Sequence, residues 1–128
     1  LSGVLVQPMA GGHVELVIGV QRSPVFGMVV MVGLGGILVE VLKDVVFRRA
    51  PFGIEEAHDM LRELRATAIL DGVRGKPGVD RDAIAKMLAN LSQWAAGMQP
   101  VLAELDLNPV LVGKDGPVAV DCVMVFER

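Results

Sequence analysis

The chain has 128 residues, a length that suits one compact domain and is too short for two of ordinary size. Its 12 Lys and Arg against 15 Asp and Glu give a net charge of -3, which excludes a strongly basic nucleic-acid-binding module because phosphate neutralisation needs clustered positive charge. Hydrophobic residues make up 52% and charged residues 21%, so the composition excludes a disordered chain.

The cysteine count and the uncharged stretches indicate the cellular compartment of the chain. The single cysteine, Cys122, excludes an intramolecular disulfide framework, so a reducing cytoplasm is the simplest compartment. The longest uncharged stretch, residues 23–39, is glycine-rich and shorter than the roughly 20 apolar residues of a membrane helix, so we expect no membrane partner. Because the chain begins at Leu1 and residues 4–9 already have the pattern of a strand, we expect residues 1–128 to be a single domain cut from a longer chain.

The first half of the chain has the pattern of strands. Residues 14–20 are short and β-branched, and residues 26–32 repeat that pattern after the Arg22–Pro24 turn, which predicts a hairpin. The glycines of residues 33–36 predict a break, and residues 44–48 predict a further strand.

Helical spacing follows, and then strands return. Apolar residues three or four apart between Ile54 and Ala68 predict a helix, residues 70–78 predict a loop, and a second helix is expected between an N-cap at Asp80 and Pro100. The remaining residues predict a hairpin, with strands over 104–108 and 118–126 and a turn over 113–116. This order indicates an α+β fold, a mainly antiparallel sheet with two helices packed on one face.

The C-terminal hairpin carries the clearest chemical signal. A turn centred on Lys114 and Asp115 pairs residues whose numbers sum to 229, which places Asn108 opposite Asp121. Directly opposed side chains project from one face with Cβ atoms about 5 Å apart. An amide oxygen and a carboxylate at that separation suit Mg²⁺, which prefers oxygen ligands.

Alternation adds two more acceptors to the face that carries Asn108 and Asp121. Glu104 and Asp106 should lie there, while the intervening residues should point into the core: Leu105, Leu107, Val120 and Cys122. Four acceptor-rich side chains without a Lys or Arg among them leave repulsion that a cation would relieve. The alternative interpretation is an ordinary solvated strand face.

Other polar features are less specific. The glycines of residues 33–36 are able to bring backbone amides close to phosphate, or simply to end a strand, and they match no P-loop pattern. His13 and His58 have no Ser or Cys at a recognisable spacing, so a catalytic triad is not expected.

The order of these segments resembles the C-terminal part of the ATP-grasp domain of ADP- or NDP-forming acyl-CoA synthetases. That family includes acetate–CoA ligases and relatives of the nucleotide-binding β subunit of succinyl-CoA synthetase. The resemblance covers nearly the whole chain, and it rests on these segments: GVLVQPM at 3–9, VELVIGV at 14–20, PVFG at 24–27, GLGGILVE at 33–40, GVRG at 72–75, ELDLNP at 104–109 and AVD at 119–121.

The resemblance implies a nucleotide site at the start of the chain. Gln7, Pro8 and Met9 would form the hinge whose backbone meets the adenine, and Glu15 would bind the ribose of the nucleotide. Pro8 stands where many relatives have an acidic residue, so side-chain contacts at the hinge would differ. The nucleotide would be ATP or GTP.

The resemblance also implies roles around the phosphates. Asn108 and Asp121 would hold Mg²⁺, in agreement with the hairpin geometry, and Asp106 would lie beside the metal and orient a phosphorylated histidine. The residues expected near the transferred phosphate or another anion are Gly35, Gly36, Glu40 and Arg74. Glu40 and Asp106 are therefore the expected catalytic residues.

The implied reaction makes acyl-CoA, nucleoside diphosphate and phosphate from a carboxylic acid, coenzyme A and a nucleoside triphosphate, through an acyl phosphate and a phosphohistidine. The acid, coenzyme A and the acceptor histidine would come through missing domains of an oligomeric full-length protein, so we expect the 128 residues alone to be inactive. Two alternatives stay open: another ATP-grasp ligase that joins a carboxylate to an amine, and a non-catalytic regulatory module fused to an acetyltransferase.

Overall fold

A computed structural model describes residues 14–35, 43–72, 78–113 and 115–127. The strand predicted at 4–9 and His13 lie outside these residues. The described elements, in chain order, are β1 (Val14–Ser23), β2 (Gly27–Leu34), β3 (Val45–Arg49), α2 (Ile54–Glu63), the 3-10 helix η2 (Thr67–Asp71), α3 (Arg81–Gly97), β4 (Leu102–Gly113), β5 (Gly116–Ala119) and β6 (Cys122–Phe126).

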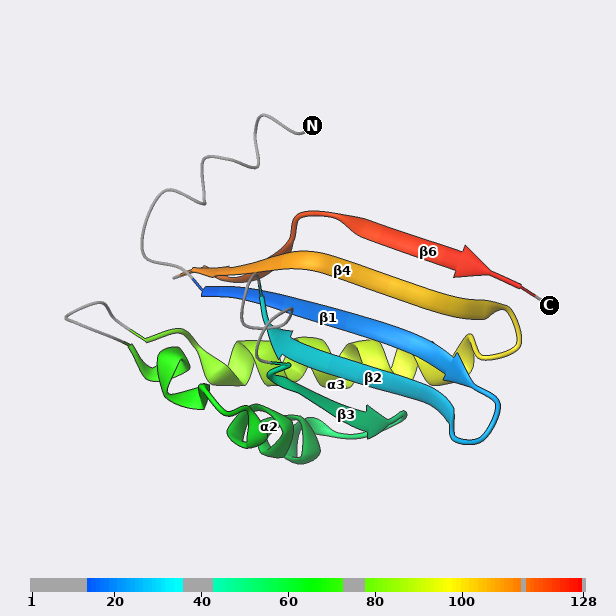
Figure 1. Cartoon of the computed structure of the whole chain (residues 1–128), viewed down its shortest axis with the longest axis horizontal. Helices are drawn as coiled ribbons and strands as arrows, with labels where there is room; N and C mark the ends of the chain where they lie inside the picture. The colour runs from blue at the N-terminus through cyan, green and yellow to red at the C-terminus, as the bar shows by residue number, and fades with distance from the viewer. Residues whose placement is uncertain (1–13, 36–42, 73–77, 114, 128) are drawn as a thin grey trace.

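The strands form one six-stranded antiparallel sheet in the order β3-β2-β1-β4-β5, with β6 also paired to β4 (Figure 1). The predicted hairpin of β1 and β2 is confirmed, and Ser23 faces Gly27 at its end. The Ser23 hydroxyl accepts hydrogen bonds from the backbone N–H groups of Val25 and Phe26, at 3.2 and 3.1 Å. Gly27 then takes a φ of 79°, which suits a residue without Cβ.

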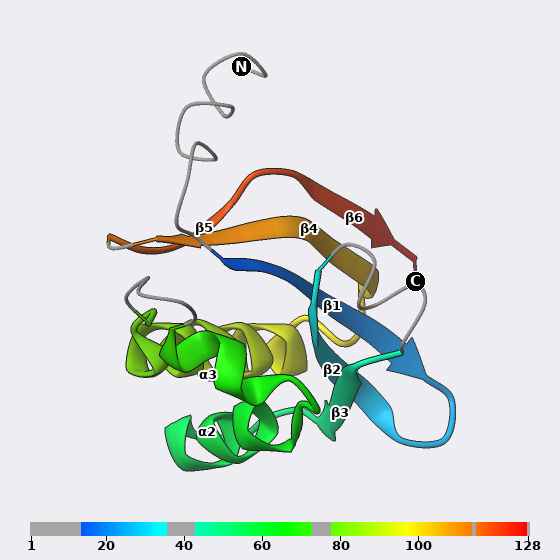
Figure 2. The ribbon, with the colours of Figure 1, turned by 60° about the vertical axis from the view of Figure 1, so that its left-hand side comes forward.

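The two described α helices, α2 and α3, lie on one face of the sheet, and the other face carries no described helix (Figure 2). The core fills the space between the sheet and the helices. Its fully buried side chains include Leu16 and Ile18 of β1, Met60 of α2, and Ile84 and Leu88 of α3. The predicted α+β class, with two helices on one face of a mainly antiparallel sheet, is confirmed.

Polar contacts fix the position of α3. Asp80 is its N-cap, as predicted, because its carboxylate accepts from the backbone N–H of Ala83 at 3.2 Å. The buried Ser92 hydroxyl accepts from the Phe52 N–H at 3.0 Å and is within hydrogen-bonding distance of the Phe52 carbonyl, at 3.1 Å. His58 Nε2 lies 3.0 Å from Asp82 Oδ1 and so links α2 to α3.

The helix predicted over 54–68 is shorter in the structure. α2 ends at Glu63, and the chain continues as η2, in which Leu70 is fully buried although a loop was predicted there. The cause is a distant side chain: the buried carboxylate of Asp44 accepts from the backbone N–H groups of Arg65 and Ala66, at 2.6 and 3.0 Å. These bonds take the place of helical ones.

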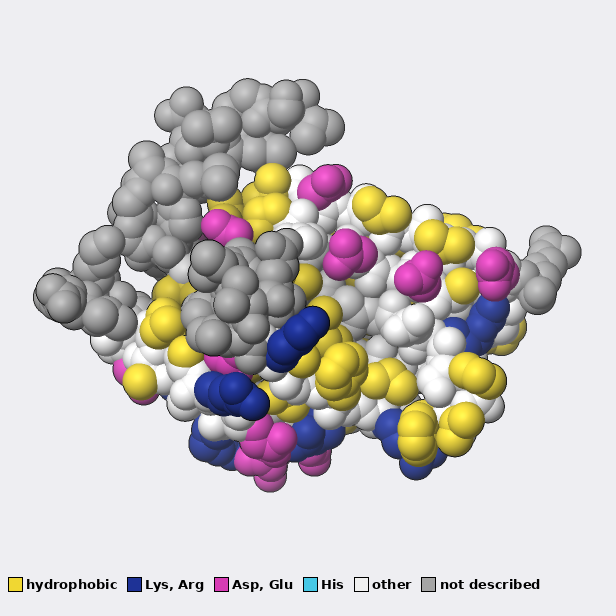
Figure 3. All heavy atoms as spheres, viewed as in Figure 1, with side chains coloured by type: hydrophobic (Ala, Val, Ile, Leu, Met, Phe, Trp, Pro, Cys, Tyr) yellow, Lys and Arg dark blue, Asp and Glu magenta, His cyan; other side chains and the backbone are white. Residues whose placement is uncertain are grey.

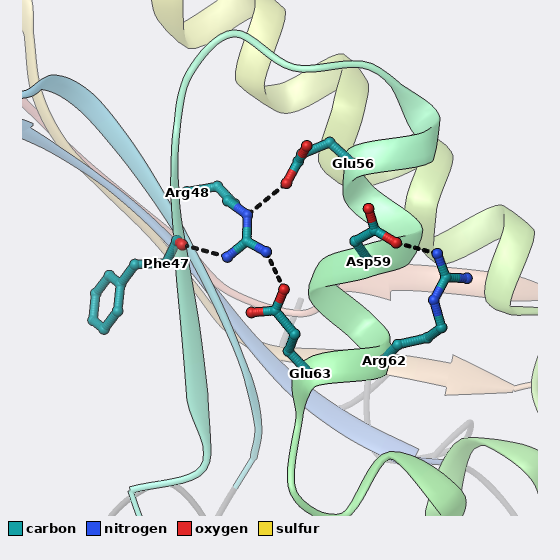
Figure 4. A network of polar contacts seen from close by, with 6 residues as sticks. All are labelled: Phe47, Arg48, Glu56, Asp59, Arg62 and Glu63. Atoms are coloured by element: carbon teal, nitrogen blue, oxygen red, sulfur yellow. Dashed lines mark hydrogen bonds and ion pairs between the residues drawn. The ribbon is translucent and has the colours of Figure 1, made fainter.

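The edge strand β3 is anchored to α2 by ion pairs (Figure 4). Arg48 Nε lies 2.6 Å from the carboxylate of Glu56, and the same guanidinium contacts Glu63 and the backbone carbonyl of Phe47. The hydrogen bond that Arg48 donates to Glu63, followed by the one that it donates to Glu56, raises the pKa of Arg48 above its ordinary value. The guanidinium therefore stays charged and holds the strand against the helix.

Two strand predictions need correction. β2 continues through Gly33 and Leu34, where a break was predicted, because Gly33 pairs with Val17 on one side and Val45 on the other. The return strand predicted over 118–126 is split into β5 and β6, and residues 120–121 belong to neither.

The prediction that Cys122 points into the core is wrong, because its side chain is exposed. β6 is exposed at every position, and Val120 just before it is only half-buried, since β6 is not packed against the helical layer. Leu105 and Leu107 of β4 are buried as predicted. In the part of the chain that the structure describes, no helix is long and apolar enough to cross a membrane.

Candidate functional site

The face of the sheet opposite the helices, called here the open face, carries the polar residues that the sequence singled out. Gly19 of β1 pairs with Met31 of β2 on one side and with Asp106 of β4 on the other, and Met31 pairs with Phe47 of β3. Directly opposed residues project to the same face. These four residues therefore form one row across the open face.

A second row lies one pleat further along the strands. Gln21 of β1 pairs with Val29 of β2 and with Glu104 of β4. The two rows line a pocket of 240 Å³, which has the carboxylates of Glu104 and Asp106 on one side. Its other side is apolar and is formed by Val29, Met31 and Phe47.

The space-filling view shows the same division of the open face (Figure 3). Acidic side chains run in a line along β4, and hydrophobic side chains lie over β2 and β3. The acidic row expected from strand alternation is therefore present on the surface.

A bulge in β4 sets the position of Asn108. Leu16 of β1 pairs with Val110, but Ile18 pairs with Leu107, so β4 has one extra residue at this point. Asn108 is exposed, as is Asp106 two residues before it, whereas Leu107 and Val110 are buried on the helical side.

The predicted pairing of Asn108 with Asp121 is confirmed at the level of the backbone. The register Val112–Pro117 in β5 and Leu107–Cys122 in β6 keeps the sum of 229. Between them, the Asn108 N–H donates to the carbonyl oxygen of Asp121 at 3.3 Å. An amide side chain on β4 and a carboxylate side chain in the link between β5 and β6 are therefore neighbours, and both are exposed.

The chemistry of this pair fits a divalent cation. Asp121 Oδ1 accepts from the backbone N–H of Cys122 at 2.9 Å, which restricts its side chain. Within the described ranges, no Lys or Arg forms an ion pair with Glu15, Glu104, Asp106 or Asp121. Those ranges also contain no group of three His, Cys, Asp or Glu residues placed to hold a metal ion, so the amide–carboxylate pair stays the candidate.

Glu15 lies at the other end of the open face and is brought next to Gly35. The Gly35 N–H donates to the Glu15 carbonyl oxygen at 2.7 Å. A Cβ on Gly35 would lie 3.1 Å from the Glu15 Cβ and 3.2 Å from its backbone, so the approach of the two segments favours glycine.

Six of the predicted site residues lie outside the described residues, and their roles stay predictions: Gln7, Pro8, Met9, Gly36, Glu40 and Arg74. Sequence reasoning missed the pocket residues Gly19, Gln21, Met31 and Phe47. Phe47 gave the clearest signal, because an aromatic side chain next to the buried Val46 must point away from the core, and it is 57% exposed.

A comparison with protein families decides the assignment. The model of an ATP-grasp domain family matches residues 1–126. The chain belongs to the ATP-grasp domain family. The resemblance seen in the sequence is thereby confirmed, and the relatives of this ATP-grasp chain are ADP-forming acid–CoA ligases.

Two relatives illustrate the similarity. The ATP-grasp chain is 49% identical to acetate–CoA ligase (ADP-forming) I of Archaeoglobus fulgidus, over 98% of this chain and 18% of that protein. It is 42% identical to the β subunit of acetate–CoA ligase (ADP-forming) I of Pyrococcus furiosus, over 98% of this chain and 54% of that subunit. The chain therefore spans about half of that β subunit and a smaller share of the longer ligase.

Solved structures show the same fold. One is an acetyl-coenzyme A synthetase 1 of Ca. Korarchaeum cryptofilum in complex with coenzyme A and Ca-AMPCP, with a TM-score of 0.86 and 40% identity over 92% of this chain and 51% of that chain. Another is the same synthetase with coenzyme A and Mg-AMPPCP, with a TM-score of 0.85 over 92% of this chain and 55% of that one.

Proposed function

We propose that residues 1–128 are the C-terminal part of the ATP-grasp domain of an ADP-forming acyl-CoA synthetase, which makes acyl-CoA from a carboxylic acid, coenzyme A and ATP. The relatives support this assignment. Their names include acetate, 4-hydroxybutyrate and trans-feruloyl, so the proposal is limited to the class of carboxylic acids.

The single observation that carries the proposal is the pairing of Asn108 with Asp121 on the open face, next to Asp106. In the proposal, the Asn108 amide oxygen and the Asp121 carboxylate hold Mg²⁺. An ion held there would supply positive charge beside the phosphates of the nucleotide, and positioning and charge stabilisation are most of what phosphoryl transfer requires. A solved relative contains Mg-AMPPCP, which supports the choice of metal.

Two further polar residues of the open face, Glu15 and Asp106, are given roles in the proposal. Glu15 accepts hydrogen bonds from the ribose, and Asp106, beyond the metal pair, orients the side chain that receives the phosphoryl group. The other proposed contacts are the hinge residues Gln7, Pro8 and Met9, the phosphate contacts Gly35 and Gly36, the catalytic Glu40 and the anion contact Arg74.

The proposed setting is the cytoplasm, and the proposed partners reach the site through other parts of a longer, oligomeric protein. Those partners are the carboxylic acid, coenzyme A and a phosphorylated histidine. In one solved relative, the Ca. Korarchaeum cryptofilum synthetase with Mg-AMPPCP, a phosphohistidine segment points towards the nucleotide-binding site, which supports this arrangement. In this proposal, the 128 residues alone do not catalyse acyl-CoA formation, because those other parts are required.

The test measures nucleotide affinity in the complete parent protein by calorimetry, with and without Mg²⁺. The wild type should gain affinity for a non-hydrolysable ATP analogue when Mg²⁺ is added, and Asp121→Ala should lose most of that gain. Asp115→Ala is the matched control, because Asp115 is an exposed aspartate in the turn of the same hairpin. An Asp121→Ala protein with an undiminished Mg²⁺ effect would remove the metal assignment.

A second assay tests the reaction class. Thioester formation that depends on ATP, coenzyme A and a carboxylic acid is expected from the parent protein across a small panel of acids. Consumption of ATP with an amine in place of coenzyme A would instead identify a carboxylate–amine ligase, and retained nucleotide binding without any turnover would identify a regulatory module.

A further inference from the structure

Arg81, the first residue of α3, ties that helix to the end of η2. Its Nε and Nη2 atoms donate to the two carboxylate oxygens of Asp71, at 2.9 and 3.1 Å. Nη2 also donates to the backbone carbonyl oxygen of Thr67 at 2.8 Å. A guanidinium that contacts a carboxylate through two nitrogens fixes orientation as well as distance, so this link is stiffer than a single ion pair.

The backbone on the two sides of residues 72–78 is also held together. The Val79 N–H donates to the Leu70 carbonyl oxygen at 2.8 Å. A Cβ on Gly78 would lie 2.7 Å from the carbonyl carbon of Asp71 and 2.8 Å from the Leu70 carbonyl oxygen. Both distances are shorter than a Cβ atom tolerates, so the close return of the chain requires glycine at this position.

We call Asp71, Gly78 and Arg81 the Arg81 clamp. The segment that runs between its two sides is short and contributes two cationic residues, Arg74 and Lys76, both of which lie outside the described residues. None of the clamp's own contacts uses these two cations, because the clamp is made of described residues alone. The clamp therefore fixes the ends of a segment whose positive charges are available for another contact.

The Arg81 clamp lies at the end of the sheet that carries the proposed nucleotide contacts. α3 begins beside the hairpin of β4 and β5, because a Cβ on Gly116 would lie 3.9 Å from the Ala83 Cβ. Figure 1 shows η2 and the start of α3 at the end where β1 begins and β4 ends, and Glu15 of β1 pairs there with Leu111 of β4. Phosphoryl transfer needs positive charge around the phosphates, and the segment between the clamped ends supplies two cations to this end.

We propose that Arg81 is a positioning residue for nucleotide binding. Through the clamp it holds both ends of the 72–78 segment, so that Arg74 meets a phosphate of the nucleotide with little left to order on binding. The inference rests on the proposed anion contact of Arg74 and adds a residue that touches no ligand itself, since its Nε and Nη2 donate to Asp71 and Thr67. Pre-ordered contact groups raise affinity because less conformational entropy is lost when the ligand binds.

A double-mutant cycle in the complete parent protein tests the role of Arg81. Calorimetry measures the Kd of the ATP analogue AMPPCP with Mg²⁺ for the wild type, Arg74→Ala, Arg81→Ala and the double variant. Arg74→Ala should weaken binding at least about tenfold, because it removes a charge-assisted contact. Arg81→Ala should weaken binding about three- to tenfold when Arg74 is present and less than about 1.5-fold when Arg74 is already absent.

A merely structural role of Arg81 would give a different pattern. Loss of the pair with Asp71 should lower the melting temperature by the same amount in both backgrounds, whereas the loss of affinity should depend on Arg74. Arg81→Lys keeps the charge but not the two-nitrogen contact, so its Kd should lie between those of the wild type and Arg81→Ala.

Arg62→Ala is the matched control for the loss of an arginine–aspartate pair. It removes the exposed pair with Asp59 on α2, away from the clamp, and should change the Kd by less than about 1.5-fold.

Two results separate this inference from the function on which it rests. Equal weakening by Arg81→Ala in both backgrounds, or no weakening in either, would overturn the positioning role and leave the nucleotide site in place. An unchanged Kd in Arg74→Ala would remove the anion contact itself and this inference with it, while the effect of Asp121→Ala on the Mg²⁺ dependence still tests the metal pair.

Discussion

Asp44 gives the sharpest quantitative prediction from the fold. Asp44 is only 3% exposed and lies just before β3. It accepts hydrogen bonds from the N–H groups of Arg65 and Ala66, at 2.6 and 3.0 Å, immediately after α2 ends. One side chain thus joins the edge of the sheet to the helical layer.

The expected cost follows from these two bonds. Asp44→Ala leaves two partly buried backbone donors without their acceptor, and hydrogen bonds to a charged group contribute about 1.5–3 kcal/mol each. The release of a buried carboxylate from its desolvated site offsets part of that loss. We expect a net decrease of about 2–4 kcal/mol in the free energy of unfolding, and about half of that for Asp44→Asn, which keeps one acceptor oxygen.

Urea unfolding followed by circular dichroism measures both variants. Asp59→Ala is the control, because Asp59 is a half-exposed aspartate of α2 paired with Arg62 and should change stability by less than about 0.5 kcal/mol. A decrease below about 1 kcal/mol for Asp44→Ala, with an unchanged denaturant slope, would refute the assignment of Asp44 as the acceptor that ends α2.

Two further predictions concern the pocket and the loop before α3. Gly19→Ala should leave the free energy of unfolding unchanged or raise it by up to about 1 kcal/mol, measured by urea unfolding. The added Cβ would lie 3.6 Å from the Leu105 carbonyl oxygen and from the Met31 methyl, which are ordinary van der Waals contacts. A clear loss of stability would contradict this prediction. Hydrogen bonds from Arg81 hold the pKa of Asp71 below its ordinary value, so Arg81→Ala should raise it in an NMR titration. Because the folded pKa is lowered, this pairing stabilises the fold above the ordinary Asp pKa and is lost as the pH falls through the lowered value. An unchanged titration curve would assign the shift to another group.

The sequence predicted the features that depend on neighbours along the chain. Alternating apolar residues located most strands, Asp80 marked the start of α3, and the turn near residue 114 set the register that pairs Asn108 with Asp121. Each of these depends on contacts within one hairpin or one helical turn, which local patterns describe well.

Features that depend on distant segments were not predictable. The end of α2 is set by Asp44, 21 residues before Arg65, and no pattern near Arg65 reveals that acceptor. Cys122 alternates toward the helical side, but its exposure depends on how far the helical layer extends beneath the sheet. The open-face pocket likewise joins residues of four strands, and their register across the sheet is a tertiary property.

The bulge at residues 108–109 lets β4 bury apolar side chains on both sides of it while Asn108 stays exposed. Leu105 and Leu107 reach the core on odd positions, and a regular strand would then turn Val110 and Val112 toward the open face. The extra residue reverses the alternation after Asn108, so both valines are buried while Asn108 keeps the face of the acidic row. The irregularity therefore lets one continuous strand complete the core and still present its amide beside Asp121, which is why the polar pair lies at the bulge and not elsewhere along β4.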